Sequence, residues 1–434
     1  MLKNQRLFFL IVFVISVSSL FGNGLSLNSI GSKALGMGGA FVGYANDATA
    51  IYWNPAGLAQ QNSSLKFALS DIVPYANYEA DGSDYGYPAQ AFSIKSETKT
   101  NHYFNPNLFF NYRKDKMAFA FGIYIPAGLG TEYNGKDLAS LTENDESIEW
   151  MSKIGAVNFS PAFAYQIHEK LSLGIAGNMY YALFEMKRLG GSADTNGDNI
   201  DEAFQYSEES TGIGMSATLA TKFDITEKIS IGLTYRIPTK VTLEGEAVNK
   251  FMPIAATSMQ TTAPEISEFE RELTWPGWFA AGIAFRAMDK LVFTFDAQLS
   301  QWSELDKLIT EFDDTVWNQL AIASEENEFV LLWEDKTQIR FGVEYGINES
   351  WDIRCGYYYD PAPAPDETLN ILFPSSTNNV LTSGFGYDFG KFSTDFGIEY
   401  LFGAERKVVE TDDNMPGIHQ MNILAYSLGI NYNF

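Results

Sequence analysis

Strict alternation of apolar and polar side chains is the feature that most constrains this chain. In residues 338–345 one face would carry Ile339, Phe341, Val343 and Tyr345, and the other Gln338, Arg340, Gly342 and Glu344. The segments 229–236, 291–300 and 351–359 repeat the pattern. A period of two belongs to β-strands whose two faces meet different surroundings. The sequence therefore predicts an all-β fold.

The lengths of these segments and of their connections separate a membrane barrel from a soluble sandwich. Many segments reach the roughly 9 to 11 residues with which a tilted strand crosses a bilayer, whereas sandwich strands are usually shorter. Short turns at 167–170, 287–290, 346–350 and 389–391 alternate with long, acidic connections. Short turns on one rim and long loops on the other are typical of transmembrane antiparallel β-barrels of the outer membrane.

We predict about 14 strands, an even number as bacterial single-chain barrels have. Pro126, which lacks an amide hydrogen, is expected to end the third strand, although it would also suit an interruption of the wall. The segment 88–98 is placed in the first outer loop. The predicted strands are 63–79, 101–113, 117–126, 151–167, 170–188, 209–224, 228–245, 270–287, 290–303, 336–347, 351–360, 379–389, 392–403 and 420–434.

Both ends of the chain indicate export to a bacterial outer membrane. Lys3 and Arg6 precede an apolar run over 7–21, which is the layout of a secretory signal peptide, here 1–22. The run is shorter than the roughly 20 residues of a membrane-spanning helix. The last predicted strand closes on Phe434 and resembles the terminal strand that barrel-assembly machinery recognises. That machinery and outer-membrane lipid are therefore the expected partners of assembly.

Composition and motifs exclude several other classes of protein. A net charge of -25 disfavours nucleic acid, and Cys355, the single cysteine, allows no internal disulfide. No nucleophile-elbow, phosphate-loop or zinc-protease motif is present, so neither catalysis nor a cofactor is expected. The acidic stretch 194–202 has carboxylates spaced somewhat like a calcium loop, but Asn199 and Gln205 stand where such a loop has Gly and Glu. A plain acidic loop is the favoured interpretation, and no metal site is predicted.

Residues 23–62, which precede the first strand, lack sustained alternation and are rich in Gly and Ala. A disordered periplasmic tail is one interpretation, but Phe41, Tyr44, Tyr52 and Trp53 make the segment too apolar for it. Glycine lets backbones pack closely. We therefore predict a compact hatch, residues 23–62, inside the lumen of a barrel that spans 63–434.

Three motifs in this region resemble the FadL/TodX-like outer-membrane transporters of long-chain fatty acids and hydrophobic compounds. They are Ala34-Leu35-Gly36-Met37-Gly38-Gly39-Ala40, Asn46-Asp47-Ala48-Thr49-Ala50 and Asn54-Pro55-Ala56-Gly57-Leu58. Residues 124–133 are similar to the end of the family's third strand, Asp296 with Trp302-Ser303 to its ninth, and 341–345 and 354–357 to its tenth and eleventh. Residues 360–366 match the loop that follows. The resemblance covers nearly the whole mature chain.

The resemblance implies passive uptake of a long-chain fatty acid or of an aromatic or aliphatic hydrocarbon. It places Asn54, Pro55 and Ala56 against an inward kink of the third strand, at Pro126 and Gly128, where ligand would leave sideways into the membrane; these three residues are also readable as a simple hatch turn. It assigns ligand capture to the outer loop that holds Phe251, Met252, Pro253, Ile254 and Met259, whose apolar side chains could equally cover the rim.

Three arginines on predicted inward faces could bind a fatty-acid carboxylate, since guanidinium pairs with carboxylate bidentately. These are Arg236, Arg340 and Arg354. The alternative is that Asp296, Glu344, Asp352 and Glu399, also predicted to face inward, neutralise them. For the chain as a whole the alternative functions are an adhesin or structural barrel and, more distantly, a barrel phospholipase.

Overall fold

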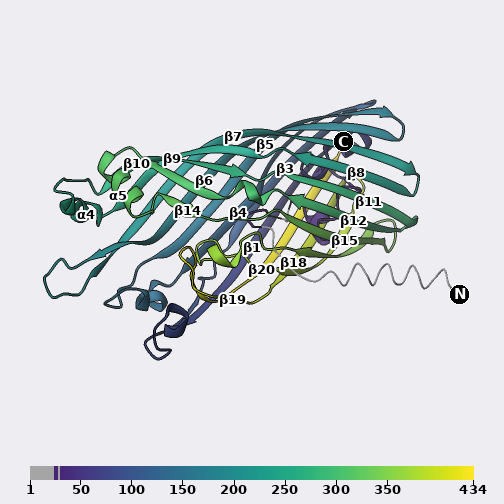
Figure 1. Ribbon diagram of the computed structural model, residues 1–434. Coiled ribbons are helices and arrows are strands. Elements are labelled where there is room, and N and C mark those ends of the chain that lie inside the picture. Colours follow the sequence, from purple (N-terminus) through teal and green to yellow (C-terminus); the bar gives the residue numbers. More distant parts are fainter. Residues whose placement is uncertain (1–23, 28–29) are drawn as a thin grey trace, which may run out of the picture.

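The structure is a computed structural model that describes residues 24–27 and 30–434, so the predicted signal peptide lies outside the described residues. Fourteen antiparallel strands form a closed barrel. The first and last strands, Ser64–Asp81 and Gly417–Asn433, pair along their length and close it. Figure 1 shows the strands running obliquely along the wall. The predicted fold class is confirmed.

Two of the fourteen barrel strands consist of two segments each. In chain order the fourteen are β1 (Ser64–Asp81), β3 (Tyr103–Lys114), β4 (Met117–Tyr133), β5 (Trp150–His168), β6 (Leu171–Ala193), β7 (Glu202–Thr226), β8 (Ile229–Arg236) with β9 (Thr239–Asn249), β10 (Ile266–Trp275) with β11 (Trp278–Met288), β12 (Leu291–Ser300), β15 (Lys336–Gly346), β16 (Trp351–Asp360), β17 (Asn378–Asp388), β18 (Phe392–Gly403) and β20 (Gly417–Asn433).

Short elements decorate this barrel. The additional strands are β2 (Ser93–Glu97), β13 (Lys307–Phe312), β14 (Glu328–Val330) and β19 (Arg406–Val408). The α-helices are α2 (Ser32–Gly36), α3 (Ala50–Trp53), α4 (Met252–Ser258) and α5 (Thr315–Ala323). The 3-10 helices are η1 (Pro55–Gln60), η2 (Gly82–Tyr85), η3 (Gly135–Leu141), η4 (Trp302–Glu304) and η5 (Asp366–Thr368). None of the helices within the described residues is long and apolar enough to cross a bilayer.

The two faces of each strand differ as the alternation predicts. On β1 the Phe67 side chain is 45% exposed on the outside of the barrel, while its neighbour Lys66 is 1% exposed. On β15, Phe341 and Tyr345 are exposed and Arg340 is buried. Apolar residues outside and charged residues inside invert the pattern of a soluble protein, and they suit a wall that is surrounded by lipid.

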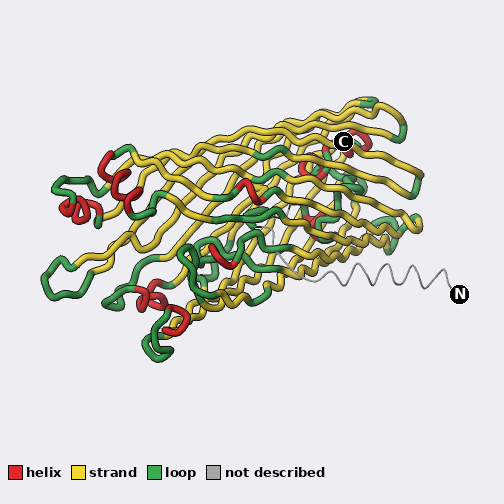
Figure 2. The backbone as a smooth tube through the Cα atoms, viewed as in Figure 1, coloured by secondary structure: helices red, strands yellow, loops and turns green. Residues whose placement is uncertain are grey.

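The two rims of the barrel are unequal. At one rim, strands are joined by short turns, as Figure 2 shows, and these include the four predicted at 167–170, 287–290, 346–350 and 389–391. The other rim carries long connections with α4 and α5. The segment 88–98 lies in the first of these connections, as predicted, and also forms β2, which pairs with β1.

Several predicted strands have different limits in the structure, and in three of them a proline is the point of difference. The predicted strands 228–245 and 270–287 are interrupted at Ile237-Pro238 and Pro276-Gly277, because proline cannot donate to the ladder. The prediction that Pro126 ends the third strand is wrong. β4 continues to Tyr133, with a register shift against β5 between Tyr124 and Ala127.

The N-terminal region, here residues 30–62, packs against the inner face of the wall on several sides. Gly43 lies so close to Gly282 of β11 that a β-carbon on Gly43 would stand 2.7 Å from the Gly282 carbonyl carbon. On another side, Gly36 faces Gly384 of β17. Glycine at both partners permits this backbone-to-backbone approach. Side chains of the wall add hydrogen bonds to the N-terminal region, such as that from Thr234 Oγ1 to the Trp53 carbonyl oxygen at 3.0 Å.

Candidate functional site

The wall of the barrel is interrupted beside β4. The ladder of paired residues between β3 and β4 stops at Leu108 and Ile123. Further toward the outer rim, backbone contact on this side of β4 resumes at Glu132, whose carbonyl oxygen accepts from the Lys99 amide at 2.8 Å. The bend at Pro126 falls in this interval. The two strands therefore separate beside Pro126.

Residues Leu25–Leu27, here called the closing segment, pair with the bend. The Leu27 amide donates to the Pro126 carbonyl oxygen at 2.9 Å, and the Gly128 amide donates to the Leu25 carbonyl oxygen at 2.9 Å. Ser26 and Ala127 form the antiparallel bridge between these two bonds. At the bend of β4, the backbone groups of Pro126 and Gly128 are thus hydrogen-bonded to the closing segment and not to the neighbouring strand β3.

Tyr103 of β3 stands at the edge of the same interruption. A β-carbon added to Gly130 of β4 would clash with the ring and hydroxyl of Tyr103. The Tyr103 side chain therefore spans from one side of the separated strands to the other. Glycine at position 130 is what leaves room for it.

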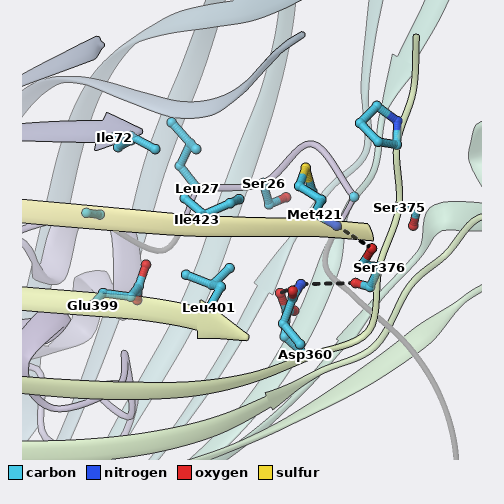
Figure 3. Close-up of a pocket in the computed structure, with 14 residues that line it drawn as sticks. Ser26, Leu27, Ile72, Asp360, Ser375, Ser376, Glu399, Leu401, Met421 and Ile423 are labelled. Carbon is cyan, nitrogen blue, oxygen red and sulfur yellow. Dashed lines mark hydrogen bonds between the residues drawn. The ribbon is translucent and has the colours of Figure 1, made fainter. Parts of the chain in front are cut away.

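A cavity lies next to the closing segment (Figure 3). Ser26 and Leu27 form one part of its lining, and β18 and β20 form another. Two buried carboxylates, Asp360 and Glu399, also line it. The remaining side chains are mostly apolar or hydroxyl-bearing: Ile72, Pro374, Ser375, Ser376, Asn378, Leu401, Met421, Ile423 and Ala425. A molecule in this cavity would touch the segment that occupies the bend.

Asn54, Pro55 and Ala56 make their closest described contacts with the N-terminal region itself and with β6 and β7. The Asn54 side chain donates to the carbonyl oxygens of Val42, at 2.9 Å, and Thr221 of β7, at 3.1 Å. Its oxygen accepts from the Ala56 amide at 3.1 Å, which starts η1. The backbone of Pro55 and Ala56 rests on Gly174 of β6. Their geometry is that of a turn packed on β6 and bonded to β7, and their role at the kink of the third strand stays a prediction.

A chain of buried charges ties the N-terminal region to the wall. Lys66 of β1 pairs with Asp47 at 2.5 Å and with Asp395 of β18 at 3.1 Å. Arg354 of β16 contacts Asp395 at 2.8 Å and Glu344 at 2.6 Å. This ionic chain ends at the N-terminal region again, because Lys33 pairs with Glu344 at 2.8 Å.

Tyr44 belongs to the same cluster. Its hydroxyl donates to Glu344 at 2.6 Å. Burial, reinforced by the charge of Glu344, raises the pKa of Tyr44 well above its ordinary value. The hydroxyl therefore keeps its proton and remains a donor across the physiological pH range.

The three predicted arginines have different partners in the structure. Arg354 is neutralised by Glu344 and Asp395 in the ionic chain. Arg340 donates to the Gly38 carbonyl oxygen at 3.2 Å and stands 4.9 Å from the centre of the Tyr358 ring. Each of these two side chains thus holds part of the inner structure.

Arg236 has no carboxylate in an ion pair among the described residues. Its guanidinium lies 4.5 Å from the centre of the Tyr52 ring and 5.2 Å from that of Trp278. It donates to Thr218 Oγ1 at 3.2 Å and to the Tyr52 carbonyl oxygen at 3.3 Å. Cation–π contacts and neutral acceptors stabilise this buried charge.

Of the other predicted acids, Asp296 accepts from the Val42 amide at 2.6 Å, and Glu399 accepts from the Tyr358 hydroxyl at 2.9 Å. Asp352 lies 3.5 Å from Arg354. Neutralisation of arginine by the predicted acids is therefore seen at Arg354, through Glu344 and Asp352. Asp395, which completes that cluster, was missed although it alternates with Gly397 and Glu399 on one face of β18.

The apolar outer loop folds into α4 and packs against α5. Met252 is buried, Phe251 and Ile254 are partly buried, and Met259 is 44% exposed. The Phe251 ring lies 5.9 Å from that of Phe204. Part of this loop therefore supports the rim, as the alternative interpretation has it, and Met259 remains accessible from outside.

The acidic stretch 194–202 uses its carboxylates within the loop. Asp194 accepts from the amides of Gly197, at 2.6 Å, and Asn199, at 2.9 Å. These backbone bonds hold the pKa of Asp194 below its usual value. Across the described ranges of the chain, no cluster of three or more His, Cys, Asp or Glu side chains is arranged to hold a metal ion.

Comparison with known proteins shows which family has this architecture. The family model described as "Outer membrane protein transport protein (OMPP1/FadL/TodX)" matches residues 13–434. The long-chain fatty acid transport protein of Escherichia coli K12 is 22% identical over 95% of this chain and 94% of its own. Outer membrane protein P1 of Haemophilus influenzae is 24% identical over 92% of this chain and 93% of its own.

Solved structures share the fold. A FadL homologue from Pseudomonas aeruginosa superposes with a TM-score of 0.77 at 16% identity, over 95% of this chain and 100% of that one. The toluene transporter TbuX from Ralstonia pickettii gives a TM-score of 0.69 at 19% identity, over 94% of this chain and 99% of that one. The family consists of outer-membrane transport channels and not of enzymes. Since its model spans nearly the whole sequence, this chain belongs to the OMPP1/FadL/TodX family of outer membrane transport proteins.

Proposed function

We propose that this protein takes up long-chain fatty acids or other hydrophobic compounds passively and releases them sideways through its wall. The observation that carries the proposal is the interruption beside β4, which the closing segment occupies from inside through two backbone hydrogen bonds. Displacement of Leu25–Leu27 would uncover the bend at Pro126. An apolar molecule would then pass from the adjacent cavity directly toward lipid and avoid water, which apolar surface disfavours.

The ionic chain supports a sideways exit over one straight through the barrel. To clear the lumen, the N-terminal region would have to break the pairs of Asp47 with Lys66 and of Lys33 with Glu344. Lys66 is 1% exposed, and breaking a buried pair costs about 3–5 kcal/mol, toward the lower end here because Lys66 would keep Asp395 and Glu344 would keep Arg354. Displacing the closing segment costs two backbone hydrogen bonds, each worth about 1 kcal/mol, and the burial of Leu25, which is 2% exposed and contributes about 2 kcal/mol.

Capture would occur at the outer rim. Met259 presents a flexible, polarizable side chain on the exposed side of the α4 loop. A pocket near the same rim is lined in part by Leu141, Trp150, Phe329 and Leu372. The names of the relatives supply the substrate range, since one is named for long-chain fatty acids and another for toluene.

A reversible lock on the closing segment tests the route. Ser26 and Ala127 are a non-hydrogen-bonded antiparallel pair, because the two bonds flank them. Such pairs have Cα atoms about 4.5 Å apart, which suits a disulfide. We would introduce Ser26→Cys and Ala127→Cys in a Cys355→Ser background and express the full-length protein in a Gram-negative host that lacks its own transporter of this family. The readout is uptake of radiolabelled oleate and of toluene.

The oxidised double variant should lose most of its uptake and regain it after reduction, while either single cysteine variant should behave as the parent. Unchanged uptake by a fully oxidised protein would overturn release past the closing segment. If the parent itself conveys neither compound, transport of these classes is excluded.

A further inference from the structure

The interruption beside β4 is covered by the closing segment and is also crossed by a side chain of β3. The Asn105 side-chain amide donates to the carbonyl oxygen of Ile125 at 3.2 Å. Ile125 lies outside the paired residues of the ladders that β4 forms with β3 and with β5. A side chain of β3 therefore takes the place of a backbone bond between the two separated strands.

The neighbours of Asn105 on the inner face of β3 have other roles. Asn107 donates to the Asn105 carbonyl oxygen at 3.2 Å and so bonds along its own strand. Toward the outer rim, the ring of Tyr103 lies against Gly130. Asn105 itself is only 2% exposed, so its bond to Ile125 is shielded from water. Asn105 and Tyr103 thus both reach from β3 to β4 between the end of the ladder and the outer rim.

These two crossing side chains leave too little room for a ligand between them. Residues two apart on a strand lie about 6.6 Å from each other. Non-bonded carbon atoms keep about 3.5–4 Å apart, so a chain inserted between Asn105 and Tyr103 would need at least about 7–8 Å. With Asn105 withdrawn, the free length of β3 from Leu108 to Tyr103 is about 16 Å, which admits an acyl chain or an aromatic ring.

We propose that Asn105 is a second closure of the exit, in series with the closing segment, and releases Ile125 each time a hydrophobic molecule leaves through the wall. The closing segment covers the bend from the lumen through the backbone groups of Pro126 and Gly128, whereas Asn105 spans the wall itself. Because the two closures bond different groups of β4, each can open while the other stays shut. This inference rests on the proposed function, since it concerns the regulation of that route.

Substitutions of Asn105 in the full-length protein test this closure. Asn105→Ala removes the hydrogen bond and the bulk, while Asn105→Leu keeps a side chain of similar size without a donor. Asn178→Ala is the matched control, because Asn178 is also buried and bonded, to Thr218 at 3.0 Å, but lies on β6. Each variant is made alone and together with Leu27→Pro, which removes an amide donor of the closing segment.

Three measurements are needed for each variant. The initial rate of toluene uptake is measured in the Gram-negative host that lacks its own transporter of this family. The change of electrophoretic mobility on heating shows which variants are folded. Leakage of radiolabelled raffinose from proteoliposomes reports any general loosening of the barrel, because this polar sugar would not leave through a gap that faces lipid.

Both Asn105 variants should raise the rate of toluene uptake about fivefold, as the loss of one hydrogen bond implies. Combination with Leu27→Pro should multiply the two effects to about 25-fold, since independent changes add in free energy. Asn178→Ala should take up toluene at the parent rate. Raffinose leakage should stay at the parent level in all of these variants.

The inference is overturned if a folded Asn105 variant takes up toluene at the parent rate, or if its raffinose leakage rises as well. A double variant no faster than Leu27→Pro alone would also overturn it, because the two closures would then be one. The cysteine lock between positions 26 and 127 separates the two proposals. Uptake by Asn105→Ala with that lock oxidised would refute release past the closing segment, whereas an unresponsive Asn105 in a protein that the lock does block would refute the second closure alone.

Discussion

The Leu27 amide lies 2.9 Å from the carbonyl oxygen of Pro126, so a residue that precedes the packed N-terminal region completes the backbone bonding of a wall strand. The closure of the barrel beside β4 is therefore a property of two distant parts of the chain. It can be weakened without altering any wall residue.

Leu27→Pro removes this donor, because proline has no amide hydrogen. Loss of one hydrogen bond worth about 1 kcal/mol should raise the population of the displaced closing segment about fivefold. The initial rate of toluene uptake should rise accordingly. Leu27→Ala retains the amide and serves as the control; equal rates for the two variants would show that this bond does not hold the closure.

Tyr103→Ala should widen the interruption, because the Tyr103 side chain reaches across it to Gly130. Uptake of bulky hydrophobes should increase relative to uptake of toluene, as measured by competition between the two in cells. Tyr112→Ala, at an exposed aromatic residue near the other end of the same strand, should leave that ratio unchanged. A similar change in both variants would mean that the effect is a general loosening of β3.

Lys66→Met should destabilise the folded protein by about 3 kcal/mol, the lower end of the cost of breaking a buried pair, because Asp47 would lose its cation and Asp395 would keep only Arg354. The measurement is the temperature at which the barrel loses its folded mobility in electrophoresis, together with protease cleavage within the N-terminal region. Lys95→Met breaks the exposed pair with Glu79 and should cost no more than about 1 kcal/mol. A stable Lys66→Met protein would remove the argument against a straight exit.

Met259→Ser should raise the concentration of substrate needed for half-maximal uptake several-fold, because it removes apolar contact at the proposed capture loop. The maximal rate should stay the same, since the bend and the cavity are untouched. Ile200→Ser changes an equally exposed apolar residue in a different outer loop and should have no effect. Capture elsewhere on the rim is indicated if both variants leave uptake unaltered.

The sequence was most informative where apolar and polar side chains alternate along the chain. Alternation at residues such as Phe341 and Arg340 predicted both faces of the wall, because lipid and lumen impose opposite requirements on successive side chains. Pro238 and Pro276 were visible as well, but alternation continues across them, so the breaks they cause were not predicted.

Contacts between distant segments were beyond what the sequence could supply. The closing segment meets β4 across about 100 residues of chain, and no local pattern marks Ser26 as the partner of Ala127. The cavity likewise draws Leu27, Asp360, Glu399 and Met421 from four separate parts of the sequence. Glu399 was predicted to face inward, but only the folded wall shows that it accepts a hydrogen bond from Tyr358.

The contact between Gly43 and Gly282 bears on how this protein can be re-engineered. Neither position has room for a β-carbon, so the N-terminal region and β11 fit each other as a matched pair. A chimaera that places this N-terminal region in the barrel of a relative should assemble only if the recipient has glycine opposite residue 43. Exchange of substrate specificity between relatives would therefore require the transfer of wall and lumen residues together.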